Sequence, residues 1–311
     1  MARYAFLFPG QGSQTTGMAL DLYDAIPSVR ELFGQASAAL GMNMHTFLME
    51  ADNETLKRTD KAQPALTLAN LAAVYALQQR GITAVAVAGH SLGEYAALVV
   101  SGVLTVENCF KLVKIRGEAM QNAAEQCPAG AGMAAVIGLT GDAVNEVISC
   151  WTAEKHDGLY AANFNSPRQT VISGLKEALD SSEARFKEAG ARRVIRLNVS
   201  GPFHSPLMEK AARRFAEAVR EIPFADPKLP FFSNVRGVEL THGDEIKTCA
   251  VEQIVAPVRW TDEEAGIAAL NVNAVLECGP GTVLAGLWKD SGAAAPCHPA
   301  GTLAAIEALT V

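Results

Sequence analysis

Residues 84–100 are AVAVAGHSLGEYAALVV. The first five are small and apolar, a composition typical of a buried central strand in a parallel sheet. The next five form a glycine-rich turn, and residues 94–100 have the apolar pattern of a helix. A strand, a tight turn and a helix in this order predict an α/β fold with Ser91 at the carboxyl end of a parallel strand.

The turn matches the pattern G-x-S-x-G, in which the serine is a nucleophile. Gly89 and Gly93 are required because the chain reverses sharply, and a side chain at either position would clash. The turn presents the Ser91 hydroxyl near the positive end of the following helix, and it frees the Leu92 N–H to donate to an oxyanion. We therefore predict that Ser91 is a nucleophile. We expect the adjacent His90 to pack or to form a hydrogen bond rather than to act as the base.

A serine hydroxyl becomes a good nucleophile only when a base removes its proton, so a partner histidine is expected. His204 follows a segment rich in turn formers at the end of a strand, where reacting groups often lie. His298 is the rival, because an α/β-hydrolase places its base late in the chain. The residue pattern favours His204 but leaves the alternative open. A thioesterase or carboxylesterase would combine Ser91 and His298 with an acid such as Asp244 or Asp262.

The residue pattern also predicts a second, smaller unit. Residues 132–199 predict the order strand, helix, two strands, helix and strand, which is the order of a ferredoxin-like unit. The strands are expected at 132–138, 159–163, 169–173 and 192–199, the helices at 142–155 and 175–189, and a turn at Asn165-Ser166-Pro167. We predict a large catalytic domain of residues 1–128 and 199–311, and an inserted small domain of residues 129–198.

The large domain is expected to contain a parallel sheet with helices. Its strands are predicted at 4–8, 84–88, 231–234 and 274–277, and its helices at 28–40, 64–80, 94–100 and 207–222, with a short last helix after the loop at 292–296. The polar loop of residues 9–14 follows the first strand, at the edge where open α/β sheets place their ligands.

Composition excludes several classes of function. The net charge of −7 over 311 residues does not suit a nucleic-acid binder, which would show a basic face. The six cysteines are widely scattered, which predicts reduced thiols rather than a disulfide framework or a metal site. No apolar stretch approaches the roughly 20 residues that span a bilayer. We therefore expect a soluble, cytoplasmic protein that binds neither nucleic acid nor membrane.

Seven short motifs make the chain resemble the acyltransferase family of fatty-acid and polyketide synthesis. They occur in the family's order between residue 6 and about residue 290, so that the resemblance covers nearly the whole chain. The motifs are Phe8-Pro9-Gly10-Gln11-Gly12-Ser13-Gln14, Gln63-Pro64-Ala65, Gly89-His90-Ser91-Leu92-Gly93-Glu94-Tyr95, Arg116-Gly117, Asn165-Ser166-Pro167, Pro202-Phe203-His204-Ser205 and Gly279-Pro280-Gly281. The resemblance implies an α/β-hydrolase-like large domain with a ferredoxin-like insertion.

The resemblance also implies roles for the residues that match these motifs. Ser91 would be the acylated nucleophile and His204 its general base, in a dyad rather than a triad. The backbone carbonyl of Gln253 would orient the histidine where a hydrolase uses a carboxylate. Gln11 and the Leu92 N–H would stabilise the oxyanion.

Three further residues would bind the substrate. The family's arginine at the position of Arg116 holds the free carboxylate of a malonyl group, and a planar guanidinium suits a bidentate pair with a carboxylate. Asn165 would reach the site from the small domain. The ring of Phe203 would crowd a branched acyl chain and so favour malonyl over methylmalonyl.

The activity implied by the resemblance is transfer of a malonyl group from malonyl-CoA to the phosphopantetheine thiol of acyl-carrier protein. It would proceed through a seryl acyl-enzyme with ping-pong kinetics, for fatty-acid or polyketide synthesis. Both half-reactions exchange one thioester for another, so no metal, nucleotide or redox cofactor is expected. The family favours a monomer. A non-catalytic alternative is a module that docks carrier proteins without turnover.

Overall fold

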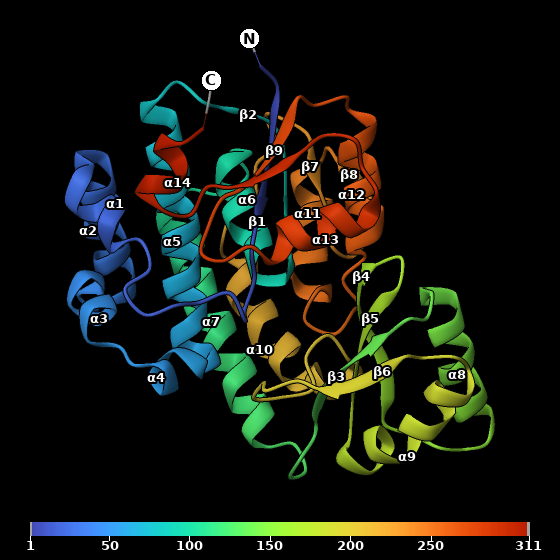
Figure 1. Cartoon of the computed structure of the whole chain (residues 1–311). Helices are drawn as coiled ribbons and strands as arrows, with labels where there is room; N and C mark the ends of the chain where they lie inside the picture. Colours follow the sequence, from blue (N-terminus) through green and yellow to red (C-terminus); the bar gives the residue numbers. More distant parts are fainter. Residues whose placement is uncertain (1, 310–311) are drawn as a thin grey trace.

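The computed structural model describes residues 2–309, and Figure 1 shows its two sheets surrounded by helices. The larger sheet has six strands: in spatial order these are β10 (Cys297–Pro299), β9 (Ala274–Glu277), β1 (Tyr4–Phe8), β2 (Ala84–Gly89), β7 (Phe231–Phe232) and β8 (Glu239–Leu240). The first five strands are parallel, and β8 pairs with β7 in the antiparallel direction.

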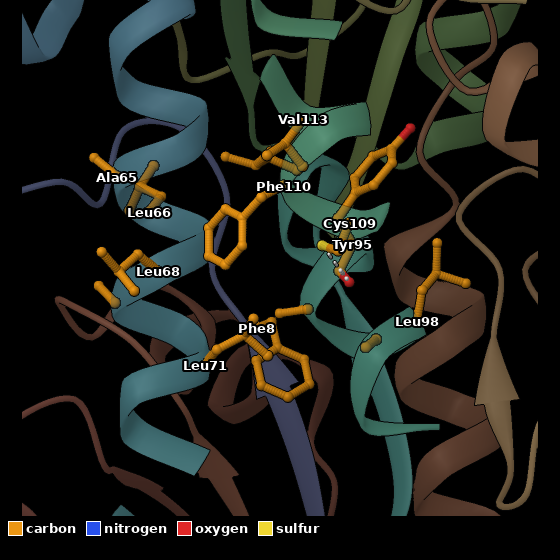
Figure 2. Packing of buried hydrophobic residues seen from close by; sticks show 14 of the residues in the cluster. Phe8, Ala65, Leu66, Leu68, Leu71, Tyr95, Leu98, Cys109, Phe110 and Val113 are labelled. Atoms are coloured by element: carbon orange, nitrogen blue, oxygen red, sulfur yellow. Dashed lines mark hydrogen bonds between the residues drawn. The ribbon is translucent and has the colours of Figure 1, made fainter. Parts of the chain in front are cut away.

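Helices cover both faces of the larger sheet. Successive residues of its central strands point to opposite sides, and because these residues are apolar, both faces need to be covered. Phe6 and Phe8 of β1 join the larger core cluster on one face, and Figure 2 shows Phe8 there with side chains of α5 and α7. Ala5 and Leu7 join a second cluster on the other face. The first face packs against α2 (Pro27–Leu40), α5 (Thr59–Gln79), α6 (Glu94–Val100), α7 (Val106–Glu125) and α10 (Glu209–Arg220), and the second against α12 (Trp260–Ala269) and α13 (Val283–Ser291).

Five further helices complete this part of the chain. They are α1 (Leu20–Ala25), α3 (Met44–Glu50), α4 (Asn53–Lys57), α11 (Gly243–Glu252) and α14 (Leu303–Glu307), and single 3₁₀ turns lie at Ser91–Gly93 and Pro206–Met208. No helix within residues 2–309 combines the length and apolar character that crossing a membrane requires.

The second sheet has four antiparallel strands. In spatial order they are β4 (Leu159–Ser166), β5 (Gln169–Gly174), β3 (Gly132–Ile137) and β6 (Arg193–Arg196). One face packs on α8 (Gly141–Ala153) and α9 (Lys176–Glu188). The opposite face contributes Met133 and Val171 to the core cluster of the larger sheet. Hydrophobic contact therefore holds the two sheets together.

Backbone hydrogen bonds also join β4 to the segment that follows α11. The Phe164 N–H donates to the Val258 carbonyl at 2.9 Å, and the Val258 N–H donates to the Ala162 carbonyl at 2.8 Å. These two bonds hold the end of β4 against the larger sheet. Asn165, one residue further along β4, thereby reaches the carboxyl end of β2.

The mixed α/β fold predicted from the sequence, with a parallel sheet and a second sheet, is confirmed. Several boundaries differ from the expected ones. The helix expected from residue 64 begins at Thr59, because a first turn forms in which Lys61 and Ala62 donate to the Arg58 carbonyl. Pro64 lies inside this helix. The loop expected at 292–296 is followed by a strand that was not predicted, β10, which adds a parallel edge strand beside β9.

Two strands are shorter than predicted because their last residues leave the sheet to form other contacts. The strand expected at 192–199 ends at Arg196, and Leu197 and Val199 line a cavity instead. The strand expected at 231–234 ends at Phe232, because a turn closed by the Gly237 N–H and the Ser233 carbonyl follows it. The turn expected at 165–167 starts later, since β4 continues through Ser166.

Candidate active site

Ser91 lies in the sharp turn between β2 and α6. Its backbone has φ of +51°, in the left-handed region that residues with a Cβ atom rarely adopt. The two flanking glycines permit the turn, because a Cβ on Gly89 would overlap the backbone of Gly93 and a Cβ on Gly93 would overlap the Phe8 carbonyl. The Leu92 N–H finds no acceptor among residues 2–309, so it is free to bind a ligand oxygen.

The hydroxyl of Ser91 is hydrogen-bonded to His204. The distance from Ser91 Oγ to His204 Nε2 is 2.7 Å, and the distance from His204 Nδ1 to the Gln253 carbonyl oxygen is 2.8 Å. A carbonyl can only accept, so Nδ1 holds the proton of the neutral ring and Nε2 is left as the acceptor. This arrangement is that of a serine and its base, with a backbone carbonyl in the orienting position.

His204 is buried, with 3% of its surface exposed. Burial and the charge of nearby Arg116 lower the pKa of the His204 imidazole to about 3. Because its resting state is therefore neutral near pH 7, the ring can accept a proton. The backbone of His204 has φ of +56°, so both partners of the Ser91–His204 pair lie in the left-handed region. Unfavourable backbone angles of this kind are concentrated at functional sites.

The loop that presents His204 is held from two sides. The Ser205 hydroxyl donates to the Pro202 carbonyl at 2.6 Å within the loop. The Ser173 hydroxyl of β5 donates to the Phe203 carbonyl, which ties the loop to the smaller sheet. The Phe203 side chain is 6% exposed and lines the same cavity as Ser91.

Arg116 extends from α7 into this cavity and is only 1% exposed. Its Nη2 donates to the side-chain oxygen of Gln253 at 2.9 Å, and its guanidinium lies 5.4 Å from the centre of the Tyr95 ring. Among residues 2–309 no carboxylate lies within ion-pair distance of it, and its Nε has no hydrogen-bond partner. Burial lowers the pKa of Arg116. A buried cation with unused donors fits an anionic ligand.

Asn165 and Gln11 lie on other walls of the cavity. Asn165 Oδ1 is 2.8 Å from His90 Nε2, so His90 forms a hydrogen bond with β4 and not with Ser91. Burial lowers the pKa of the His90 ring, which keeps it neutral. Gln11 Nε2 donates to the Thr59 hydroxyl at 3.3 Å.

The cavity has a volume of about 170 Å³. Seven of the eight residues singled out from the sequence line it, and the eighth, Gln253, lies beneath it in contact with Arg116 and His204. Apolar side chains cover much of the remaining wall: Met120, Met133, Val171, Leu197, Val199 and Leu287. The cavity thus combines a serine hydroxyl, a neutral histidine and a buried cation with an apolar lining.

The residues of the alternative hydrolase arrangement do not meet at this cavity. His298 lies on the edge strand β10 with an exposed side chain, and Asp244 is exposed in the first turn of α11. Asp262 forms an ion pair of 2.7 Å with Arg259. None of the three is among the cavity-lining residues.

Three buried polar residues beneath Ser91 were not predicted from the sequence. Asn234 accepts from the Ser91 N–H at 2.7 Å, and Asn234 itself contacts the carboxyl groups of Glu94 and Glu263. Burial raises the pKa of Glu94 to about 8 and that of Glu263 well above its usual range. The available signals were weak: Glu94 directly follows the G-x-S-x-G turn, and Asn234 is the last residue of a predicted strand.

Comparison with known proteins places this site in a family. The acyl transferase domain matches residues 5–305. A malonyl CoA-acyl carrier protein transacylase of Escherichia coli (strain K12) is 43% identical over 291 residues, which cover 93% of this chain and 93% of that protein.

Solved structures agree with this match. An acyl carrier protein S-malonyltransferase from Vibrio cholerae O1 superposes with a TM-score of 0.93 at 37% identity, covering 99% of this chain and 100% of that chain. The structure of a type II PKS acyl-carrier protein in complex with its malonyl-transacylase matches with a TM-score of 0.91 at 36% identity, covering 98% of both chains. The family match over residues 5–305 and these likenesses along nearly the whole chain show that the protein belongs to the acyl transferase family.

Proposed function

We propose that the protein transfers a malonyl group from malonyl-CoA to the phosphopantetheine thiol of acyl-carrier protein, in fatty-acid or polyketide synthesis. Its relatives in E. coli and V. cholerae are named for this reaction. The observation that carries the proposal is the buried Arg116 guanidinium, which shares a cavity with the Ser91–His204 pair and has no carboxylate partner among residues 2–309. A malonyl group supplies both a thioester carbonyl for Ser91 and a carboxylate for Arg116.

In the first half-reaction, malonyl-CoA binds with its carboxylate on Arg116. Ser91 Oγ attacks the thioester carbonyl while His204 Nε2 accepts the hydroxyl proton. The Leu92 N–H and Gln11 donate to the oxyanion that forms on the carbonyl oxygen. The carbon–sulfur bond then breaks, His204 returns the proton to the departing CoA thiolate, and a malonyl ester of Ser91 remains.

The second half-reaction reverses these steps with a different thiol. His204 removes the proton from the phosphopantetheine thiol of acyl-carrier protein, and the sulfur attacks the malonyl ester. The bond from the carbonyl carbon to Ser91 Oγ breaks, and Ser91 recovers its proton from His204. Each half-reaction exchanges one acyl bond for another, so neither oxidation nor net hydrolysis takes place.

In this scheme Gln253 positions His204. Its carbonyl accepts from Nδ1 at 2.8 Å, so it favours the tautomer with a free Nε2 and stabilises the imidazolium that forms in the transition state. Asn165 lies at the cavity wall on β4 and contacts the acyl group. Phe203 limits the space beside the acyl chain, which favours malonyl over methylmalonyl.

The same proposal includes two domains with different roles. Residues 1–128 and 199–311 form an α/β-hydrolase-like catalytic domain, supported by the parallel strands and the serine turn after β2. Residues 129–198 form a ferredoxin-like small domain, supported by the strand order β4-β5-β3-β6 with two helices on one face. The small domain contributes Asn165 and part of the apolar wall. The six free thiols suit a reducing, cytoplasmic compartment.

A competition experiment tests this function. The purified protein is mixed with equal concentrations of malonyl-CoA and acetyl-CoA, without carrier protein, and its intact mass is measured within seconds. We expect a malonyl adduct on Ser91 that is absent in Ser91→Ala. An acetyl adduct of equal size would contradict the role of Arg116. Steady release of free CoA without any adduct would indicate a hydrolase instead.

A further inference from the structure

A buried carboxamide beneath the nucleophile has no role in the mechanism above. Asn234 follows β7 and is fully buried. Its side-chain oxygen accepts from the Ser91 N–H at 2.7 Å, and its side-chain nitrogen donates to the Gly89 carbonyl at 2.7 Å. The two partners fix which end of the amide is oxygen, because an N–H can only donate and a carbonyl can only accept. Asn234 therefore spans the serine turn on both sides of His90.

A second carboxamide, that of Gln253, also forms a hydrogen bond with the Ser91 backbone. Gln253 Nε2 donates to the Ser91 carbonyl at 3.0 Å and lies 3.2 Å from Asn234 Oδ1. The peptide before Ser91 is thus held by Asn234, and the peptide after it is held by Gln253. The latter peptide includes the Leu92 N–H. Together the two amides set φ and ψ of Ser91, and so the directions of both its hydroxyl and the oxyanion donor.

Asn234 is itself held by two buried acids. Its backbone N–H donates to Glu94 Oε1 at 2.8 Å, and its side-chain nitrogen lies 2.9 Å and 3.2 Å from the two oxygens of Glu263. Both acids are fully buried, on α6 and α12 respectively. Helices from opposite faces of the larger sheet thus meet at one residue, α6 at its backbone N–H and α12 at its side chain.

We propose that Asn234 is a positioning residue for catalysis, which holds Ser91 in its left-handed conformation so that its hydroxyl and the Leu92 N–H face the same substrate carbonyl. Without the side-chain amide, the Ser91 N–H loses its acceptor, and the peptide before Ser91 keeps only the hydrogen bond from the Gly93 N–H to the His90 carbonyl, at 2.9 Å. Relaxation of the Ser91 backbone from φ of +51° is then opposed less strongly. The inference rests on the proposed function for its substrate, but the reactivity of Ser91 can also be measured without malonyl-CoA.

The test measures how fast Ser91 is modified in Asn234→Ala. Malonyl-CoA is varied, and the rate of adduct formation is followed by rapid quench and intact mass. We expect the maximal rate to fall about 10- to 100-fold, as small misplacements of a reacting group do. The concentration for half-maximal rate should change less than about threefold, because Arg116 and the cavity wall are unaltered.

A fluorophosphonate probe provides the second readout, since it reacts with an activated serine but does not use Arg116. We expect its reaction with Ser91 to slow by a similar factor in Asn234→Ala. The matched control is Ser233→Ala, which alters the neighbouring buried residue but removes a hydroxyl with no partner among residues 2–309. The control should react at the wild-type rate. The proposal would be overturned if the maximal rate is unchanged in Asn234→Ala, or if only the malonyl-CoA concentration for half-maximal rate changes.

The two readouts keep the two proposals distinguishable. A wild-type protein that reacts with fluorophosphonate but forms no malonyl adduct would refute the proposed function. The effect of Asn234→Ala on the fluorophosphonate rate would still decide whether Asn234 positions Ser91.

If Asn234→Ala does not fold, the isosteric variant Asn234→Asp provides a second test. In Asn234→Asp, a protonated carboxyl can still donate one hydrogen bond and accept another, whereas the ionised form cannot donate. The groups facing it are Glu94 from α6, Glu263 from α12 and the amide of Gln253 at the end of α11, with the Arg116 cation from α7 beyond that amide. We expect the fluorophosphonate rate, relative to wild type, to fall at least tenfold between about pH 6 and about pH 9 as the carboxyl ionises. A wild-type rate throughout this range would overturn the proposal.

Discussion

The side-chain oxygen of Gln253 lies 2.9 Å from Nη2 of Arg116. The backbone carbonyl of the same glutamine lies 2.8 Å from Nδ1 of His204. One residue therefore contacts both the guanidinium proposed to bind the substrate carboxylate and the imidazole proposed to activate Ser91. The two contacts use different atoms, so substitution of the side chain can separate selectivity from base orientation.

The variant Gln253→Glu should lose selectivity for malonyl. Its carboxylate would pair with Arg116 and repel the malonyl carboxylate, whereas acetyl has no such charge. The backbone contact to His204 is retained. We expect the ratio of malonyl to acetyl adduct from mixed CoA esters to fall at least about tenfold.

The neighbouring Glu252→Gln is the matched control for this variant. Glu252 is ion-paired with Arg236 at the surface, at 2.9 Å, and it is not among the residues that line the cavity. Its substitution should leave the ratio unchanged. An unaltered ratio in Gln253→Glu would show that this side chain does not control Arg116.

Arg116→Ala should remove the preference for malonyl more completely. The loss of a charged partner from a buried pair typically costs about 3–5 kcal/mol, or roughly two to four powers of ten in rate. Arg116→Lys should recover only part of it, since an ammonium cannot form the bidentate pair. Acylation rates with each CoA ester, measured separately, check this. A malonyl preference that survives Arg116→Ala would place carboxylate recognition elsewhere.

His204→Ala and His298→Ala should differ sharply. Removal of the base that contacts Ser91 should slow acylation by about 10²- to 10⁴-fold. Removal of the exposed imidazole on β10 should leave the rate at the wild-type level. Single-turnover acylation by malonyl-CoA compares the two, and the reverse result would favour the hydrolase arrangement.

The decrease of kcat/KM on acidification should occur only at low pH. The pKa of His204 lies at about 3, below the 6.5 of a solvated histidine, so the free enzyme keeps its base neutral on moderate acidification. We expect kcat/KM to stay level from about pH 8 to about pH 5, whereas a solvated base would lose most of its activity there.

The stability of the fold should depend on the protonation of His204 in the same sense as on that of an ion-paired carboxylate, because both groups have a lowered pKa in the folded state. The pKa of His204 is lower in the folded protein than in the unfolded chain. Below pH 6.5 the unfolded chain therefore binds a proton at this histidine that the folded protein does not bind. The contribution of His204 to the free energy of unfolding should therefore decline as pH falls from about 6.5 toward 3. Denaturant titrations of wild type and His204→Ala at several pH values measure this term, and an unchanged difference between them would contradict it.

Phe203→Ala should widen acyl selectivity. The ring is almost fully buried at the cavity wall, and its removal makes room for one methyl branch. A methyl group in such a site is worth roughly 1–3 kcal/mol, so the rate with methylmalonyl-CoA relative to malonyl-CoA should rise about 10- to 100-fold. Competition between the two CoA esters gives this ratio, and no change would remove Phe203 as a filter.

The local features of this protein could be predicted from the sequence. The small apolar run at 84–88 and the glycines of the turn predict the strand and the reversal at Ser91, because backbone preference and hydrophobic period depend on neighbouring residues. The alternation of strand and helix patterns over 132–199 predicts the second sheet for the same reason. Ends of elements were less predictable, as at Phe232 and Arg196, since tertiary contacts draw the following residues out of the sheet.

The contacts of the site depend on packing between distant segments. From the residue pattern alone, His204 and His298 both remained candidates for the base, and only the folded chain brings His204 Nε2 within 2.7 Å of a serine 113 residues away. Asn234 is likewise 143 residues from Ser91, and nothing in its local sequence indicates that contact. The sequence by itself determined the strand and the turn, and with them the position of the candidate nucleophile, because these follow from short-range sterics. Only the tertiary structure decided which polar groups are buried against them, because desolvation and hydrogen bonding depend on what packs around each group.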